Sequence, residues 1–426
     1  MKLRLHRLVT ATVASAAAAA SVLVATPHAG AAPLLCMSSA NDIYTPPATV
    51  NGSPGDLLAC RSVTLSQVPG NIAMRAWQVK YVSTDVSGKK IAVTGTVAIP
   101  NASWTGGGTR PVVAFNPGTL GLGTQCAFSK QLAGAYQDEY EGEQIASFLT
   151  AGYAVAATDG VGYMNGQTHT YVVGANAAHA LLDIVRTSFQ VPFGGLSAQT
   201  KVGIAGYSEG GAASLWAAQL AASYAPQLKV AGVASGGVPG DLRVTAAGLN
   251  GGAFAGFLAD AVIGLGAAYP NMPFDSLLNA TGRDAVSKAK GLCLLGTVSQ
   301  FAFANITNFT TDRLTLDQLY ALKGSDGRTW GQVVDDQKLG VNIGPAGSGA
   351  KYTIGFPVFQ YRGALEEVIP IATEEATHTA YCQAGITTQW KNDYAGEHLI
   401  ADGSAKDDVT KWLGARFAGT PTSGNC

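Results

Sequence analysis

The segment that most constrains this chain is residues 201–220, KVGIAGYSEGGAASLWAAQL. The apolar run at 202–205 predicts a short buried strand, and the small and apolar residues after 211 predict a helix. Between them lies Gly-Tyr-Ser-Glu-Gly, a G-x-S-x-G turn that holds its serine on a strained backbone at the carboxyl edge of a sheet. Both glycines are needed because a side chain there would collide with the neighbouring strand or helix. The pattern predicts Ser208 as a nucleophile. The alternative is a tight turn with an idle serine, which a chain with 53 glycines could contain by chance.

The N-terminus has the pattern of a secretory signal peptide. Three basic residues lie within the first seven, an apolar stretch rich in small residues follows at 8–24, and Ala-Gly-Ala at 29–31 fits a cleavage site. We therefore expect residues 1–31 to be removed on export. The alternative is an uncleaved membrane anchor, since the apolar stretch is borderline in length. No later stretch is long and apolar enough to suggest a membrane span.

The charge argues against a nucleic-acid-binding protein, and the cysteine content of an exported chain favours disulfides. The formal net charge is −1, and −4 without the three basic residues of the signal, so a nucleic-acid partner is not expected. An even number of cysteines in an exported chain favours three disulfides, of which Cys36–Cys60 would be a local bridge. Their spacing does not fit a zinc site, and we predict no metal or organic cofactor. All six cysteines lie beyond the signal, at Cys36, Cys60, Cys126, Cys293, Cys382 and Cys426.

Alternating strand and helix patterns predict the fold. A hairpin at 76–99 leads into apolar strands that alternate with helices, which is typical of a mostly parallel sheet covered by helices on both faces. Together with the G-x-S-x-G turn this predicts the α/β-hydrolase fold. Residues 32–70 lack periodicity and are expected to form an extended arm on the surface. The predicted strands are 76–83, 91–99, 111–116, 153–158, 202–205, 229–235, 356–361 and 387–391, and the predicted helices are 143–150, 175–189, 209–224, 371–384 and 405–418.

The alternation stops at 236–350. This stretch is mainly helical or irregular in pattern and shows no clear buried strand. A structureless loop of that length is implausible, so we expect a folded insertion. The predicted domains are a core made of residues 32–235 and 351–426, and a mainly helical cap at 236–350.

A nucleophilic serine needs a base, and in this fold the chain order is serine, acid, histidine. Four histidines follow the signal. His169 and His179 precede Ser208, and His378 lies within a predicted helix. His398 comes between the last predicted strand and the closing helix, where the base is expected. The alternative role for His398 is that of a loop histidine bonded to the backbone.

The acid should follow the preceding strand. The segment at 361–370, YRGALEEVIP, occupies that place and offers Glu366 and Glu367. Residue order alone does not choose between the two carboxylates.

With these residues placed, the chain resembles the secretory lipase family, the lipase-A type of α/β-hydrolase. The resemblance covers nearly all of the chain after the signal. It implies Ser208 as nucleophile, His398 as base and Glu366 as acid, with an oxyanion hole formed by the Glu209 N–H and the loop at Gly118 and Thr119. The stretches that carry it are 116–121, 125–127, 206–211, 236–239, 363–370, 397–399, 412–413 and 416–419.

The resemblance also implies that the 236–350 insertion covers an acyl-binding tunnel, and that Cys126–Cys293 and Cys382–Cys426 are disulfides. Two residues depart from the family pattern. Glu366 stands where the family has Asp, and Pro117 stands where it often has His. The longer acid requires an adjusted backbone, because a misplacement of about 1 Å can cost on the order of 10²-fold in rate.

The predicted function is that of a secreted serine carboxylic ester hydrolase, a lipase that cleaves acylglycerols or other fatty acyl esters through an acyl-enzyme on Ser208. Its partners would be a lipid or small ester and, as a second candidate, a lipid–water interface. The alternatives are a secreted peptidase or acyltransferase with the same triad, or a catalytically inactive binding module on this fold. The sequence predicts no oligomeric state.

Overall fold

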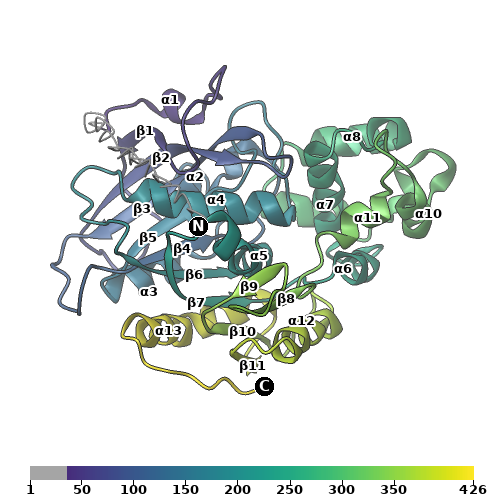
Figure 1. Ribbon diagram of the computed structural model, residues 1–426. Helices are drawn as coiled ribbons and strands as arrows, with labels where there is room; N and C mark the ends of the chain where they lie inside the picture. Colours follow the sequence, from purple (N-terminus) through teal and green to yellow (C-terminus); the bar gives the residue numbers. More distant parts are fainter. Residues whose placement is uncertain (1–35) are drawn as a thin grey trace, which may run out of the picture. The chain divides into compact units, whose positions relative to one another are not determined.

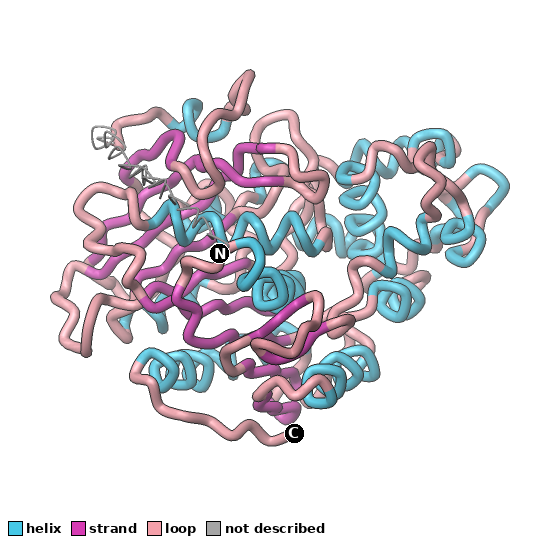
Figure 2. The backbone as a smooth tube through the Cα atoms, viewed as in Figure 1, coloured by secondary structure: helices cyan, strands magenta, loops and turns pink. Residues whose placement is uncertain are grey.

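The computed structural model describes residues 36–426 (Figure 1), and the predicted signal peptide lies outside these described residues. A nine-stranded sheet forms the centre, with strand order β1-β2-β3-β5-β4-β6-β7-β10-β11. Figure 2 shows this sheet with helices along both of its faces. The strands are β1 (Leu57–Ser62), β2 (Met74–Thr84), β3 (Lys90–Pro100), β4 (Val112–Asn116), β5 (Ala154–Thr158), β6 (Lys201–Tyr207), β7 (Lys229–Gly236), β10 (Val358–Gly363) and β11 (Thr388–Tyr394).

The direction of the strands confirms the predicted sheet. From β5 to β11 all neighbours are parallel, whereas β1, β2, β3 and β5 pair antiparallel. The central parallel strands β4, β5 and β6 are apolar and buried along most of their length because helices cover both faces. The result is the α/β-hydrolase architecture, with the carboxyl ends of the parallel strands at one edge.

Two helical layers enclose the sheet. Helices α4 and α5 contribute to one apolar core with the sheet, and α3 and α13 contribute to the other. Helix α5 follows β6 directly and is buried over most of its length. The helices outside the 236–350 stretch are α1 (Ala40–Tyr44), α2 (Phe128–Leu132), α3 (Gly142–Thr150), α4 (Gly174–Ser188), α5 (Glu209–Tyr224), α12 (Ile371–Gln383) and α13 (His398–Phe417).

Two predictions about elements were wrong. Residues 36–70 are not merely an arm, because β1 pairs antiparallel with β2 as the edge strand of the sheet. Its sequence, LLACRS, is too short to show an alternating pattern, but Leu57 and Cys60 are buried. The closing helix begins at His398 rather than at residue 405. The Glu397 side chain accepts the N–H groups of Leu399 and Ile400 and so fixes an earlier start.

Six helices lie between β7 and β10, coloured green in Figure 1. They form an apolar cluster of their own, and a short parallel pair of strands, β8 (Ile343–Pro345) and β9 (Tyr352–Ile354), follows them. No sequence pattern indicated this pair, because each strand has only three residues. The helices are α6 (Leu242–Leu249), α7 (Ala255–Ala268), α8 (Ala280–Ala289), α9 (Leu294–Phe301), α10 (Leu316–Ala321) and α11 (Trp330–Asp335).

The described chain contains three disulfide bonds. Cys126 at the end of a 3-10 turn bonds to Cys293 at the start of α9, and Gly121 forms an isolated β-bridge with the same Cys293. The other two bonds are Cys36–Cys60 and Cys382–Cys426. Within residues 36–426, no helix has the length and apolar character that crossing a membrane requires.

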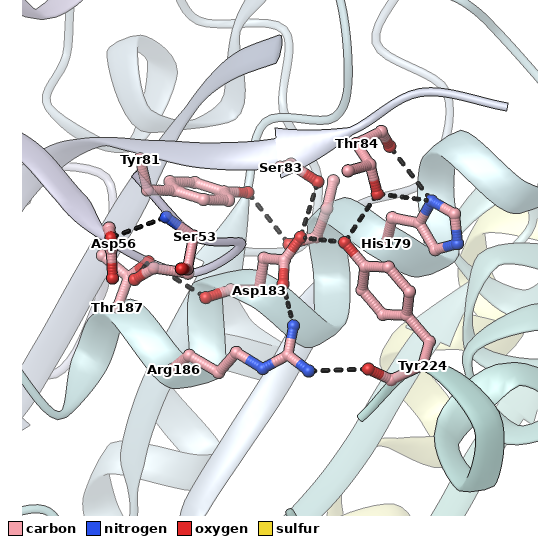
Figure 3. Close-up of polar contacts among 12 residues, drawn as sticks. Ser53, Asp56, Tyr81, Ser83, Thr84, His179, Asp183, Arg186, Thr187 and Tyr224 are labelled. Carbon is pink, nitrogen blue, oxygen red and sulfur yellow. Dashed lines mark hydrogen bonds and ion pairs between the residues drawn. The ribbon is translucent and has the colours of Figure 1, made fainter. Parts of the chain in front are cut away.

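A buried polar network fastens α4 to β2 and α5 (Figure 3). The Asp183 carboxylate accepts hydrogen bonds from Ser83 Oγ and Tyr224 Oη, both at 2.7 Å, and pairs with Arg186. His179 stacks on the Tyr224 ring with centroids 3.9 Å apart. Burial raises the pKa of Asp183 to about 6 even though its partners favour the charged form. This network lies on α4, away from the end of β6 where Ser208 sits.

Candidate active site

Ser208 occupies the turn between β6 and α5. Its backbone has φ 57° and ψ −120°, a conformation that costs a residue with a side chain on the order of 1–3 kcal/mol. The flanking glycines permit this turn. A Cβ on Gly206 would lie 2.4 Å from the Gly210 carbonyl oxygen, and a Cβ on Gly210 would lie 2.1 Å from the Asn116 carbonyl oxygen. The strained turn therefore depends on both glycines.

His398 and Glu366 form a buried pair at the same edge of the sheet. His398 is the first residue of α13, and its Nδ1 lies 2.7 Å from Glu366 Oε2 and 2.8 Å from Oε1. Glu366 Oε1 also accepts the N–H groups of Val368 and Ile369. Burial by itself would raise the pKa of Glu366, but these hydrogen bonds and the nearby imidazole outweigh it and lower the pKa below its ordinary value. The ionised carboxylate thus accepts the Nδ1–H of His398.

The carboxyl that meets the imidazole is that of Glu366. Glu367 Oε2 instead accepts the backbone N–H of His398 at 3.0 Å, at the start of α13. Of the two candidates left open by residue order, Glu366 is the one placed to orient the imidazole. Glu366 is one methylene longer than the Asp of the family pattern. The loop after β10 accommodates this length by directing the backbone N–H groups of Val368 and Ile369 toward the carboxylate.

The second ring nitrogen of His398, Nε2, is buried and has no hydrogen-bond partner among the described residues, Ser208 included. The imidazole packs against the Tyr207 ring with centroids 4.9 Å apart, and a Cβ on Gly237 would lie 2.9 Å from its Cε1. The Ser208 N–H donates to the Gly236 carbonyl at 2.9 Å. The Gly236–Gly237 peptide therefore contacts both the serine turn and the imidazole.

The expected oxyanion donors differ in their surroundings. The Glu209 N–H is the first of α5, and neither it nor the Thr119 N–H has an acceptor among the described residues. The Gly118 N–H, by contrast, already donates to Glu141 Oε2 at 2.8 Å. Burial raises the pKa of Glu141 well above its ordinary value. We therefore retain Glu209 and Thr119 as candidate donors, with Gly118 engaged by Glu141.

An apolar cavity opens in front of Ser208. It encloses about 1100 Å³ of empty space, including the part open to solvent, and its walls come mainly from the helices between β7 and β10. Only a few lining side chains carry polar atoms. The lining residues are Tyr171, Val172, Ser208, Pro239, Leu242, Thr245, Ala246, Leu249, Phe257, Leu258, Ala261, Val262, Leu265, Pro273, Phe274, Leu277, Leu278, Ile306, Thr310, Leu316, Leu319, Tyr320, Trp330, Val334, Val368 and Ile369.

Sequence reasoning set aside one residue that the structure brings to the site. His169 precedes Ser208 in the chain and was not a candidate for the base, yet its Nε2 lies 2.7 Å from Glu209 Oε1. Both side chains are buried. The available signal was Glu209 itself, a carboxylate within an otherwise apolar segment that must be buried with a partner. Within residues 36–426, no cluster of three or more His, Cys, Asp or Glu side chains has a geometry that could hold a metal ion.

Comparisons with known proteins identify the family and the fold. A family model described as "Secretory lipase" matches residues 128–425. Lipase 10 of Candida albicans is 26% identical over 404 residues, which cover 91% of this chain and 83% of that protein. A Mycobacterium tuberculosis protein named "Probable inactive lipase" is 28% identical over 396 residues, covering 90% and 83% of the two chains.

Solved structures show the same fold. The closed state of Candida antarctica lipase A superposes with a TM-score of 0.76 at 24% identity, over 90% of this chain and 87% of that chain. The rice cell wall degrading esterase LipA from Xanthomonas oryzae reaches 0.66 at 16% identity, over 87% of this chain and 100% of that chain. Since the family model spans most of the sequence, the chain belongs to the secretory lipase family and is a hydrolase of the lipase and esterase type.

Proposed function

We propose that the protein is a secreted serine ester hydrolase in which Ser208 is the nucleophile, His398 the base and Glu366 the residue that orients the base. Two observations support the proposal: the buried Glu366–His398 pair leaves Nε2 without a partner among the described residues, and the strained Ser208 lines an apolar cavity. The Gly236–Gly237 peptide contacts both the serine turn and the imidazole. The alternative bonding of His398 to the backbone alone is disfavoured, because its ring nitrogen already binds a carboxylate.

The chemistry follows from these positions. His398 Nε2 takes the Ser208 hydroxyl proton as Oγ attacks the ester carbonyl carbon, and the resulting imidazolium is stabilised by the Glu366 carboxylate. The imidazolium then protonates the alcohol oxygen as the C–O bond breaks, which leaves an acyl group on Ser208. Water, deprotonated by His398, attacks this acyl-enzyme and releases the carboxylic acid.

The tetrahedral intermediate carries an oxyanion. The N–H groups of Glu209 and Thr119 are the proposed donors, and the N-terminus of α5 adds the positive end of its dipole. Loss of one such donor costs about 10²–10³-fold in rate in comparable sites.

The substrate class follows from the cavity. Its walls offer apolar contacts and few polar partners, which suits a fatty acyl chain and leaves the backbone polar groups of a peptide unsatisfied. The helices of the 236–350 stretch supply most of the lining, so we propose that they form a cap over the acyl-binding site. Acylglycerols and other fatty acyl esters are the proposed substrates, in line with the lipases among the relatives. Three disulfides support an extracellular location.

The test uses p-nitrophenyl esters of increasing chain length and the mature protein. Ser208→Ala should abolish hydrolysis and labelling by a fluorophosphonate. Ser214→Ala is the matched control, since this serine is buried in α5, the helix that follows Ser208, and its Oγ has no hydrogen-bond partner among the described residues. The control should retain full activity, and the wild type should prefer longer acyl chains.

Other outcomes separate the alternatives. Turnover that survives Ser208→Ala would reject the nucleophile. A wild-type protein that neither hydrolyses esters nor reacts with the fluorophosphonate would support an inactive binding module. Faster acyl transfer to an added alcohol than to water, or cleavage of peptides, would identify an acyltransferase or a peptidase.

A further inference from the structure

The loop at residues 159–173, between β5 and α4, contacts both parts of the proposed oxyanion hole. We propose that this loop is a positioning element for the oxyanion hole, holding the Glu209 side through His169 and the Thr119 side through Tyr171. The inference rests on the proposed function, because it concerns the geometry of the same reaction.

The Glu209 side is held by a buried hydrogen bond. His169 Nδ1 lies 2.9 Å from the Val161 carbonyl oxygen, which can only accept, so Nδ1 carries a hydrogen. The 2.7 Å contact between His169 Nε2 and Glu209 Oε1 then contains a second proton, on one atom or the other. Whichever atom carries that proton, His169 Nε2 and Glu209 Oε1 form a hydrogen bond and do not face each other as two acceptors. Glu209, whose own N–H is a proposed oxyanion donor, is thereby fixed through its side chain.

The histidine is itself held rigidly. Its ring stacks on Tyr163 with centroids 4.3 Å apart. A Cβ on Gly160 would lie 2.9 Å from the His169 Cε1, and a Cβ on Gly162 would lie 2.1 Å from the Thr168 carbonyl oxygen. Tyr163 and Gly160 of the loop therefore pack closely against the imidazole, which has little freedom to move away from Glu209.

The Thr119 side is held by two tyrosines of the same loop. Tyr171 Oη lies 2.7 Å from Thr119 Oγ1, and Tyr163 Oη donates to the Gly121 carbonyl at 2.7 Å. One short segment thus reaches the residue after the nucleophile and two residues of the loop after β4. The relative position of the two candidate donors, Glu209 and Thr119, is set by this common support.

Such support has a physical reason in the strain of the turn. The backbone of Ser208 is in a conformation that relaxes unless its neighbours prevent it, and oxyanion donors act only when they lie within hydrogen-bond range of the developing charge. A displacement of about 1 Å costs on the order of 10²-fold in rate. The nearby Asp260 is fully buried, and its burial together with the Glu209 carboxyl raises the pKa of Asp260 well above its ordinary value.

The experiment compares His169→Ala, His169→Gln and Tyr171→Phe in the mature protein with a soluble short-chain ester. His169→Ala should lower kcat about 10- to 100-fold with KM changed less than about threefold, since the donors act mainly in the transition state. Affinity for a trifluoromethyl ketone, which forms the tetrahedral adduct, should fall in parallel. His169→Gln should restore much of the loss because its amide can hydrogen-bond Glu209. Tyr171→Phe should give a smaller loss of the same kind.

Matched controls come from the network in Figure 3. His179→Gln removes another histidine stacked on a tyrosine, and Tyr224→Phe removes a half-buried hydroxyl that donates to Asp183. These variants should lower the melting temperature but leave kcat and analogue affinity unchanged.

The result that overturns the inference is a wild-type enzyme with Ser208-dependent turnover whose His169→Ala variant keeps kcat within twofold. A loss of activity that follows the melting temperature, and that His169→Gln does not reverse, would also overturn it by making the role purely structural. Failure of the proposed function looks different, because the wild type itself would then lack Ser208-dependent hydrolysis.

Discussion

Gly237→Ala tests whether close packing positions the His398 imidazole, because Gly237 has no side chain that could take part in the reaction. Its φ is +56°, where an alanine costs roughly 1–2 kcal/mol, and the added Cβ would lie 2.9 Å from His398 Cε1 and 2.8 Å from the Tyr207 ring. Ordinary contacts begin at 3.4 Å, so the imidazole must move by about 0.5 Å or more.

A shift of that size should be visible in the rate. If about 1 Å costs on the order of 10²-fold, we expect kcat/KM for a soluble ester to fall about 10- to 100-fold. The matched control is Gly195→Ala, at φ +68° with no atom within 4 Å of the added Cβ. It has a similar backbone cost but no contact with the imidazole, so it should lose stability and retain activity.

Steady-state kinetics and urea unfolding on both variants decide the matter. If Gly237→Ala retains kcat/KM within twofold while unfolding as a single cooperative transition, the imidazole is not confined as described, and the reasoning that links the Gly236–Gly237 peptide to catalysis is refuted.

Two further predictions concern carboxyl groups near the imidazole. Glu366→Asp shortens the acid by one methylene and should lower kcat/KM by about 10²-fold, and an unchanged rate would mean that the loop after β10 adapts to either acid. Asp402 is buried one turn after His398, and burial raises its pKa to about 7 against an opposing effect of His398. Because the folded-state pKa lies above the unfolded one, its contribution to stability is fully present below about pH 4 and is lost as the pH rises through about 7. Asp402→Asn should flatten that decline in urea unfolding measured from pH 4 to pH 8, and an equally steep decline in the variant would contradict the assignment.

Local patterns were sufficient to predict the centre of the fold. The strand, turn and helix around Ser208 follow from glycine positions and apolar runs that act over a few residues. Chain order then placed His398 and left Glu366 and Glu367 as the acid. The structure distinguishes the two carboxyls by their partners. Glu366 binds the Nδ1–H of His398, whereas Glu367 binds the backbone N–H of the same residue. That distinction depends on how the loop turns and is not contained in residue order.

Long-range contacts account for what the sequence did not predict. Edge strand β1 is identifiable only through its pairing with β2. The early start of α13 is the exception, because it depends on a local cap by the Glu397 side chain. His169 was set aside because chain order excludes it as the base, but order says nothing about a supporting role. The engagement of Gly118 by Glu141 likewise joins two loops that no local pattern relates. The signal peptide and the role of residues 236–350 as a cap stay predictions.

The bond between Cys126 and Cys293 has a mechanical consequence. It fastens the start of α9 to the segment that follows β4, and the β-bridge between Gly121 and Cys293 reinforces the same seam. The start of α9 is thus attached at two points to the segment after β4. The covalent bond keeps this end of the helical stretch at a fixed distance from the segment after β4, and reducing agents would release that restraint.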